Sequence, residues 1–300
     1  MKKKNYLFFV IILFMFGNIK NIYSMNKNIN VPMINLNNGY KMPILGFGTW
    51  TLNDKDAENI VYLAIKNGYR LIDTANYYGN EIGVGKGIKK AIKEGICSRK
   101  DIFITTKIIP YYIDNYDNII KETNKKLDLE YIDLLLIHQQ GSTDKQLYKA
   151  IEKAIDLGIV KSLGISNYYT IEDYNQITKD SKILPVLIQN ENHIFYQNKE
   201  LKEYVKKNNI FIESYYPLGG RGNTSKLLNN KLIKDLSKKY NKTPAQVILR
   251  WHTQSNYIPI PGTSNLKHLK ENIDIFDFSL SNEELNLISS LDTNERYENW

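Results

Sequence analysis

Cysteine is almost missing from this chain of 300 residues, because Cys97 is the only one. A single thiol forms no internal disulfide, so the fold must rest on buried apolar side chains, which a chain of this size can supply. No low-complexity tract or strong internal repeat interrupts the sequence. With 42% hydrophobic and 24% charged residues, the composition excludes a disordered chain.

Long apolar runs are also scarce, and the clearest one occupies residues 7–16 behind three lysines at positions 2–4. The run is shorter than the roughly 20 residues that span a bilayer. A basic start followed by a short apolar core predicts that residues 1–24 are a secretory signal peptide. We therefore expect a mature domain over 25–300, exported to a periplasm, a secretory lumen or the medium, without stable membrane association. An uncleaved anchor is one alternative, and a true start at Met25, which would leave the protein cytoplasmic, is another.

The excess of positive charge is small once this leader is set aside. The formal charge is +8, but residues 1–24 hold four lysines and no acid, so the remainder carries +4. A balance this mild does not indicate a nucleic-acid partner. No metal-ligand cluster is expected either.

What the chain does contain is a regular alternation of strand and helix patterns. Strands are predicted at 44–47, 71–73, 102–107, 132–138, 162–166, 186–189, 210–215 and 258–261. Helices are predicted at 54–68, 80–94, 115–127, 143–157, 171–178, 198–208, 243–254 and 265–272. Eight such units without a linker predict an α/β fold, a single (β/α)8 TIM barrel, closed at the bottom by an N-terminal hairpin over 31–43. A doubly wound open sheet is the alternative, which the even spacing disfavours.

Polar residues stand where apolar strand patterns end: Asp73, Tyr78, Lys107 and His138. The carboxyl ends of barrel strands are where barrel enzymes hold their reactive groups. A tyrosine, whose pKa is near 10, donates a proton poorly, but a neighbouring ammonium favours its phenolate. An aspartate would hold that ammonium, and a neutral histidine would orient a carbonyl. The four residues therefore predict hydride transfer to a carbonyl group.

Seven motifs in order extend this prediction to a family. They include Asp-Thr-Ala-Asn-Tyr-Tyr-Gly-Asn-Glu at 73–81, Leu-Gly-Phe-Gly-Thr-Trp at 45–50, Gly-Ile-Ser-Asn at 164–167 and Ser-Tyr-Tyr-Pro-Leu-Gly at 214–219. The chain resembles the aldo-keto reductases, in the style of members with short C-terminal segments that reduce small carbonyls or diketogluconate. The resemblance implies an NAD(P)H-dependent oxidoreductase that reduces aldehydes or ketones, with Tyr78 as general acid, Lys107 lowering its pKa, Asp73 pairing with Lys107, and His138 placing the carbonyl.

The resemblance also implies a cofactor site, and a substrate site at Trp50, Tyr78 and His138. The implied cofactor-binding residues are Gly48, Thr49, Trp50, Asp73, Ser166, Asn167, Gln189, Tyr215, Leu218, Gly219, Ile260, Pro261, Gly262, Thr263, Ser264, His268, Glu271 and Asn272. NADPH is expected, with NADH as an alternative, since Gly262 and His268 replace the Lys and Arg that usually grip the 2′-phosphate.

Other departures concern the substrate. Gln139-Gln140-Gly141 follows His138 where many relatives have Trp-Pro, and the segment after Leu291 is short. Small aldehydes, dicarbonyls or keto-sugars are therefore favoured over steroids, and a monomer is expected. Residues 219–222 are interpreted as a mobile cofactor loop or a plain surface loop.

Gly83, Gly85 and Gly87 lack the spacing of a phosphate loop and are interpreted as helix-packing glycines. The first functional alternative is a non-catalytic nicotinamide-binding sensor or accessory subunit, which a complete catalytic quartet disfavours. The second is a barrel isomerase or aldolase in which Lys107 forms a Schiff base.

Overall fold

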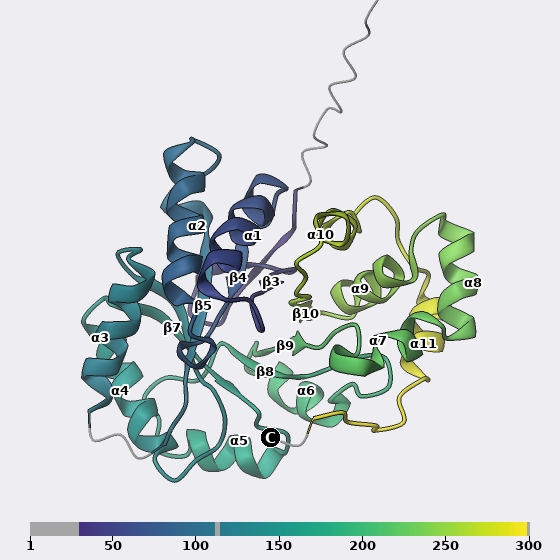
Figure 1. Ribbon diagram of the computed structural model, residues 1–300. Coiled ribbons are helices and arrows are strands. Elements are labelled where there is room, and N and C mark those ends of the chain that lie inside the picture. The colour runs from purple at the N-terminus through teal and green to yellow at the C-terminus, as the bar shows by residue number, and fades with distance from the viewer. Residues whose placement is uncertain (1–29, 112–114, 299–300) are drawn as a thin grey trace, which may run out of the picture.

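The computed structural model describes residues 30–111 and 115–298, drawn in colour in Figure 1. The predicted leader over residues 1–24 lies outside the described residues. Within them, no helix is both long and apolar enough to cross a bilayer.

Eight parallel strands form one curled sheet in chain order: β3 (Phe47–Gly48), β4 (Leu71–Asp73), β5 (Phe103–Ile108), β6 (Ile132–Ile137), β7 (Val160–Ser166), β8 (Leu187–Glu191), β9 (Phe211–Tyr215) and β10 (Tyr257–Pro259). Two hydrogen bonds join the first strand region to the last: Gly46 N–H to the Pro259 carbonyl at 3.0 Å, and Gly48 N–H to the Pro261 carbonyl at 3.3 Å. The sheet therefore closes on itself, which confirms the TIM barrel and rules out the open sheet.

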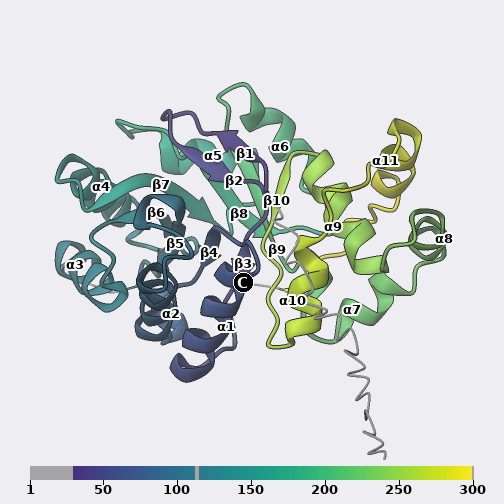
Figure 2. The same cartoon turned by 90° about the horizontal axis from the view of Figure 1, so that it is seen from above.

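Helices surround this barrel (Figures 1 and 2). They are α1 (Asp54–Lys66), α2 (Glu81–Lys93), α3 (Tyr116–Leu127), α4 (Asp144–Asp156), α5 (Ile171–Thr178), α6 (Lys199–Lys206), α7 (Gly220–Leu228), α8 (Lys231–Tyr240), α9 (Pro244–Gln254), α10 (Leu266–Ile273) and α11 (Asn282–Ser289), with short 3-10 turns η1 (Asn76–Tyr78) and η2 (Arg99–Asp101). The sequence reading missed α7, α8 and α11. α7 starts in a glycine-rich segment that reads as loop, and α8 and α11 are extra helices outside the β/α repeat.

The strands are buried on both faces, because the helices cover the outside and side chains fill the inside. Leu134, Leu135, Leu136 and Ile137 of β6 are completely buried, as expected for a parallel strand with a continuous apolar run. Polar side chains at strand ends therefore lie at one mouth of an otherwise apolar barrel.

The N-terminal hairpin closes the opposite end. It consists of β1 (Met33–Asn35) and β2 (Lys41–Pro43), which Figure 2 shows on the far side from α7. Asn37 donates to the Pro185 carbonyl at 3.0 Å, just before β8, and Asn38 donates to Ser162 Oγ of β7 at 2.9 Å. These contacts lie at or just before the amino ends of strands, so the predicted cover at the bottom is confirmed.

The first predicted strand, at 44–47, is placed differently. Only Phe47 and Gly48 belong to β3, while Ile44 donates its N–H to the Pro32 carbonyl at 2.9 Å. The early part of that apolar run therefore extends the hairpin pairing, and β3 is short.

The glycine cluster of α2 does pack helices, as predicted. A Cβ built on Gly83 would stand 1.9 Å from the Asp54 carbonyl oxygen of α1, and one on Gly85 would stand 2.0 Å from the Leu127 carbonyl oxygen of α3. Backbone at this distance cannot move aside for a side chain, so glycine is required for α2 to sit against both neighbours.

Candidate active site

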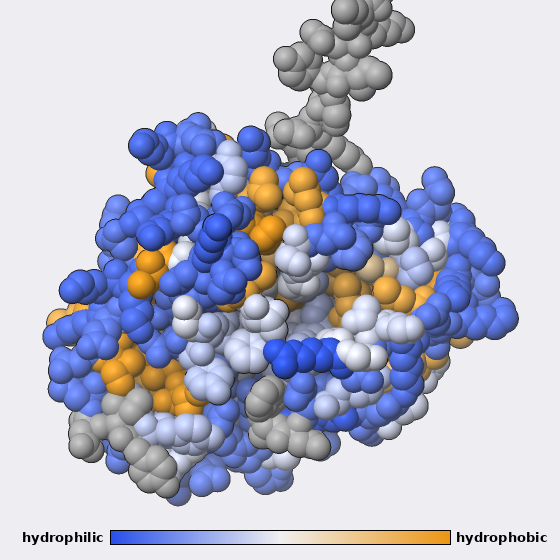
Figure 3. Space-filling view, viewed as in Figure 1, coloured by the Kyte–Doolittle hydropathy of each residue, from blue (hydrophilic) through white to orange (hydrophobic). Residues whose placement is uncertain are grey.

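A cavity of about 1200 Å³ opens at the carboxyl ends of the strands. Small-molecule pockets are typically roughly 300–1,000 Å³, so this one has room for more than one small ligand. In Figure 3, apolar and weakly polar side chains gather near the hollowed middle of the face, while hydrophilic ones dominate its periphery. The predicted site residues that line it are Gly48, Trp50, Asp73, Tyr78, His138, Ser166, Asn167, Gln189, Tyr215, Leu218, Ile260, Pro261, Gly262, Thr263, Ser264, His268, Glu271 and Asn272.

Two predicted cofactor residues lie elsewhere. Thr49 is completely buried, and its hydroxyl donates to the Asp73 carbonyl at 2.9 Å, so it fixes the end of β4 instead of facing the cavity. Gly219 sits in a tight turn, with its N–H donating to the Tyr216 carbonyl at 2.8 Å, and the following Gly220 lines the cavity. The glycine-rich segment thus leads directly into α7.

Lys107 connects two other members of the predicted quartet, Asp73 and Tyr78. Its ammonium donates to Asp73 Oδ1 at 2.6 Å, to the Thr74 carbonyl at 3.0 Å and to Tyr78 Oη at 3.1 Å. The amine of a lysine has three hydrogens, so all three are used. Because Tyr78 Oη accepts from Lys107, the phenolic proton of Tyr78 points away from the ammonium.

The charges of this group follow from its burial. Burial lowers the pKa of Lys107, but Asp73 and Tyr78 outweigh burial, and the pKa ends above its ordinary value. Burial raises the pKa of Asp73 while Lys107 opposes the rise. The raised pKa of Lys107 favours its charged form, whereas the raised pKa of Asp73 favours its neutral form. We take the ion pair as the resting state, because Lys107 and Gln189 both donate to the carboxylate of Asp73.

Burial has a larger effect on the pKa of Tyr78 than Lys107, which opposes it as expected. Burial raises this pKa, and the ammonium of Lys107 only opposes the rise, so the pKa does not end below its ordinary value. The cause is desolvation, which disfavours the phenolate in the barrel mouth. Tyr78 therefore holds its proton in the resting site.

His138 stands beside Tyr78, with 5.7 Å between ring centroids. Burial, helped by the charge of Lys107, lowers the pKa of His138 to about 3, so the imidazole is neutral at physiological pH, as expected. Its Nδ1 is buried and has no hydrogen-bond partner among the described residues. The neutral ring is available to a polar group that enters the cavity.

The residues predicted to hold a nicotinamide carboxamide come together on the other side of the mouth. Asn167 adopts a left-handed backbone conformation with φ of 63°, donates to the His138 carbonyl at 2.9 Å, and accepts from Tyr215 Oη at 2.9 Å. Tyr169 also bonds Tyr215, with 2.8 Å between the two hydroxyl oxygens. Asn167 thus fixes the ring of Tyr215 as a flat wall of the cavity.

The floor of the cavity is bare backbone. A Cβ on Gly48 would lie 2.8 Å from the Ile260 carbonyl oxygen, and a Cβ on Gly262 would lie 2.7 Å from the Gly48 carbonyl oxygen. Both glycines are therefore needed where β3 and the segment after β10 meet. A side chain at position 262 would push these backbones apart.

The described residues that line the far end of the cavity include no lysine or arginine: they are Thr263, Ser264, His268, Glu271 and Asn272. Lys267 lies beside them, with its Nζ 3.8 Å from Glu271 Oε1. Arg221 is the only lysine or arginine among the described residues that line the cavity, and it lies over Trp50, with its guanidinium carbon 5.5 Å from the ring centroid. The residues at the far end include His268 and the carboxylate of Glu271. A carboxylate suits a ribose diol, whereas a 2′-phosphate needs cations.

The sequence reading missed Glu213, a completely buried carboxyl group on β9. Gln189 donates to it at 2.6 Å and to Asp73 at 2.8 Å, so Glu213 belongs to the same polar group. The available signal was the charged residue inside the apolar run 210–215, at a place where packing alone would select an apolar side chain.

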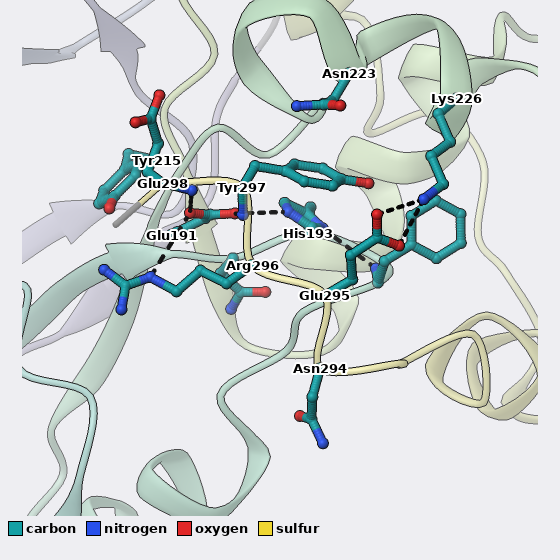
Figure 4. A network of polar contacts seen from close by, with 12 residues as sticks. Glu191, His193, Tyr215, Asn223, Lys226, Asn294, Glu295, Arg296, Tyr297 and Glu298 are labelled. Atoms are coloured by element: carbon teal, nitrogen blue, oxygen red, sulfur yellow. Dashed lines mark hydrogen bonds and ion pairs between the residues drawn. The ribbon is translucent and has the colours of Figure 1, made fainter. Parts of the chain in front are cut away.

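A second buried carboxylate, Glu191 at the end of β8, fastens the C-terminal segment (Figure 4). It accepts from the N–H groups of Tyr297 at 2.6 Å and Glu298 at 2.9 Å, and lies 3.0 Å from His193 Nε2. The ring of Tyr297 stacks on His193 with 4.5 Å between centroids. The segment 292–298 is thus held at the carboxyl end of β8, with Glu298 near Tyr215 (Figure 4), and we call it the C-terminal strap.

The outer part of the cavity is aromatic and polar. Trp50 and Tyr77 stack with 6.3 Å between ring centroids, and the amide of Gln139 donates to the hydroxyl of Tyr111. These side chains surround the entrance to Tyr78 and His138. Among the described residues no group of three or more His, Cys, Asp or Glu is arranged to hold a metal ion.

Comparisons with known proteins agree with this geometry. The sequence profile described as the Aldo/keto reductase family matches residues 44–293. The NAD(P)H-dependent D-xylose reductase I,II of Candida tropicalis is 36% identical, with 91% of this chain and 96% of that protein covered. The NADP-dependent D-sorbitol-6-phosphate dehydrogenase of Malus domestica is 33% identical, with 88% and 94% covered.

Solved structures give the same result. An aldo/keto reductase from Brucella melitensis superposes with a TM-score of 0.81 at 38% identity, covering 88% of this chain and all of that one. The Bombyx mori aldo-keto reductase in complex with NADP gives a TM-score of 0.83 at 31% identity, covering 89% and 95%. The chain therefore belongs to the aldo/keto reductase family, and it is an NAD(P)H-dependent oxidoreductase.

Proposed function

We propose that this protein reduces small polar aldehydes and ketones to alcohols, with Tyr78 as the proton donor. The observation that carries the proposal is the contact of Lys107 with Tyr78 Oη at 3.1 Å, beside the neutral ring of His138. Because Lys107 occupies one side of the phenol oxygen, the proton of Tyr78 is directed to the other side.

The residues divide the reaction between them. The nicotinamide cofactor, when bound, supplies the hydride. His138 binds the substrate oxygen, and Tyr78 gives its proton to that oxygen as negative charge develops there. Lys107 stabilises the phenolate that remains, and Asp73, 2.6 Å from Lys107, keeps the ammonium charged and in place.

Several features of the cavity fit a bound nicotinamide cofactor. Gly48 and Gly262 leave a floor without side chains, and Tyr215 presents a flat ring held by Asn167 and Tyr169. Ser166, Asn167 and Gln189 line the cavity as polar groups for the carboxamide. These residues would hold the nicotinamide half against the mouth of the barrel.

Substrates with hydroxyl groups suit the entrance. Trp50 and Tyr77 offer ring faces to C–H groups, and Gln139 and Tyr111 offer polar groups beside them. Relatives of this chain include reductases of D-xylose. We therefore propose small aldehydes, dicarbonyls or sugars as the substrate class, in place of large apolar ketones.

An assay with purified protein tests this function. Oxidation of reduced cofactor is followed with methylglyoxal, D-xylose and benzaldehyde, and the alcohol product is quantified. Stoichiometric formation of alcohol is expected with at least one of them. Tight cofactor binding without turnover across this panel would instead support the non-catalytic sensor.

We propose that both NADH and NADPH are used, with less preference for NADPH than an arginine at position 268 would give. The supporting feature is the lining at the far end of the cavity, which holds Glu271 and His268, while the nearby Lys267 is paired with Glu271 at 3.8 Å. His268→Arg is expected to raise the affinity for NADPH about tenfold and leave NADH unchanged, by fluorescence titration. Equal gains for both cofactors would contradict this.

Export and the monomeric state are also proposals. The basic and apolar character of residues 1–24 supports a cleaved leader. N-terminal sequencing of the mature protein with cell fractionation tests it, since an intact Met1 or a start at Met25 would contradict cleavage. Sedimentation is expected to give one chain per particle.

A further inference from the structure

Glu213 lies in the barrel interior next to the candidate active site but has no part in the mechanism above. The parallel pairing of β8 and β9 sets Gln189 directly beside Glu213, so their side chains are neighbours inside the barrel. Gln189 Nε2 donates to Glu213 Oε2 at 2.6 Å and, across the barrel, to Asp73 Oδ2 at 2.8 Å. One amide group thus joins two carboxyl groups that come from β9 and β4.

These contacts fix which way the amide of Gln189 points. An amide nitrogen has two hydrogens, and both are used by the two carboxyl groups. Rotation of the amide by 180° would place its oxygen against the carboxylate of Asp73, which is unfavourable. The oxygen Oε1 of Gln189 is therefore the group left for a ligand, and Gln189 lines the cavity.

The balance of charge supports a neutral Glu213. Asp73 and Glu213 share this interior with one cation, Lys107, which contacts Asp73 and not Glu213. Burial, and then the negative charge of Asp73, raise the pKa of Glu213 to about 8. Glu213 Oε1 has no hydrogen-bond partner among the described residues, a situation that a neutral acid tolerates better than a carboxylate. Glu213 thus serves as a fixed acceptor without adding a second buried charge.

We propose that Glu213 is a positioning residue, which locks the amide of Gln189 so that its oxygen receives the amide hydrogens of the nicotinamide carboxamide. This inference rests on the proposed function, since it deepens the same site. The hydrogen-bonded row Tyr78, Lys107, Asp73, Gln189 and Glu213 would then fix the proton donor and the nicotinamide ring relative to each other.

Two substitutions of Glu213 distinguish its role as a hydrogen-bond acceptor from any role of its charge. Glu213→Gln keeps an oxygen that accepts from Gln189, and Glu213→Met fills a similar volume without an acceptor. We expect Glu213→Gln to bind NADH within about twofold of the unmodified protein, and Glu213→Met to bind it about tenfold more weakly, because one hydrogen bond in a buried site is lost. Affinity for ADP-ribose, which lacks the nicotinamide ring, should not change in either variant.

A cofactor analogue tests the proposal without any substitution. In the 3-acetylpyridine analogue of NADH, a methyl group replaces the NH2 of the carboxamide, so nothing is donated to Gln189. The unmodified protein should bind it about tenfold more weakly than NADH, and Glu213→Met should not discriminate between them. Equal binding of both by the unmodified protein, or equal behaviour of the Gln and Met variants, would overturn the proposal.

The outcome separates this inference from the proposed reaction. If NADH binds with the expected discrimination but no carbonyl is reduced, the positioning role stands and the reductase proposal fails. If carbonyls are reduced without discrimination between the two cofactors, the positioning role fails alone.

Discussion

At the scale of single residues, Lys107 of β5 joins Asp73, at the end of β4, to Tyr78, in the turn that follows β4. Its three hydrogens go to Asp73, Thr74 and Tyr78, so the ammonium is fully hydrogen-bonded. Lys107 is completely buried, so its bonds to Asp73 and Thr74, which are also buried, are expensive to lose. The same contacts hold Tyr78 and keep its proton on the cavity side.

Lys107→Met tests both consequences. The variant should lose about 10²- to 10⁴-fold in kcat, because the phenolate is no longer stabilised. It should also lose roughly 3–5 kcal/mol in free energy of unfolding, because Asp73 remains buried and unpaired. Carbonyl reduction and urea denaturation measure the two effects.

A second substitution provides the control. Adding Asp73→Asn to Lys107→Met removes the unpaired charge, so stability should recover in large part while activity stays low. Recovery of activity in the double variant would contradict a role for the ammonium in catalysis.

The limits of sequence reading are also visible at this scale. Asp73, Tyr78, Lys107 and His138 were predicted because each follows or ends an apolar strand pattern, and the structure brings them together. Glu213 was not predicted, because its importance depends on the bond of Gln189 to Asp73, residues 116 positions apart. The raised pKa of Tyr78 could not be predicted either, since desolvation depends on packing that no local sequence pattern specifies.

At the scale of elements, the C-terminal strap and α7 frame the mouth of the barrel. The strap is held by Glu191 at one point, and Lys226 of α7 pairs with Glu295 at 2.5 Å at another. The Glu191 contact is completely buried on the carboxylate side, while the Lys226 pair is about half exposed, at 49% and 43%. Buried contacts of this kind are worth more than surface ion pairs.

Glu191→Gln should therefore loosen the strap. A glutamine accepts from only one of the two N–H groups, of Tyr297 and Glu298, and turns its own amide hydrogens toward the other. Amide hydrogen exchange at these two positions is expected to accelerate about tenfold or more.

Glu295→Gln is the matched control, because it removes only the exposed pair with Lys226 and should change exchange at Tyr297 and Glu298 by less than about threefold. If both variants loosen the strap equally, the anchoring role of Glu191 is wrong.

Among the elements themselves, those of the β/α repeat were predicted, since their apolar periodicities alternate clearly. The hairpin was predicted from its Asn-Gly turn. The helices α7, α8 and α11 lie outside the repeat, so the pattern of eight strand–helix units did not predict them.

At the scale of the whole molecule, buried ionisable groups set how stability depends on pH. The pKa of Glu213 is raised to about 8 in the fold, against an ordinary value of 4.5. Between these values the unfolded chain releases this proton first, so the folded state loses stability as pH rises through that window. The pKa of His138 is lowered to about 3. As pH falls below 6.5 the unfolded chain takes up this proton first, so the folded state loses stability there.

Glu213→Gln removes the first of these effects. The variant and the unmodified protein should have similar stability at pH 5, while at pH 9 the variant should be more stable by on the order of a few kcal/mol. Denaturation curves at several pH values measure the difference, and parallel pH profiles for the two proteins would show that Glu213 is ionised at all of them.

The barrel as a whole followed from the sequence because eight units of similar length and pattern allow few other folds. A closed barrel implies that its first and last strands meet, but the close backbone approach of Gly48 and Gly262 at that seam did not follow from any local pattern. That contact shapes the cavity floor and bars a lysine from position 262.

The central claim is that Tyr78 donates the proton, and Tyr78→Phe tests it most directly. The variant keeps the ring beside Trp50 and His138 but has no phenolic proton. Cofactor affinity, measured by fluorescence titration, should stay within about twofold, while kcat for carbonyl reduction falls at least about a hundredfold. Reduction at an undiminished rate by the phenylalanine variant would contradict the account.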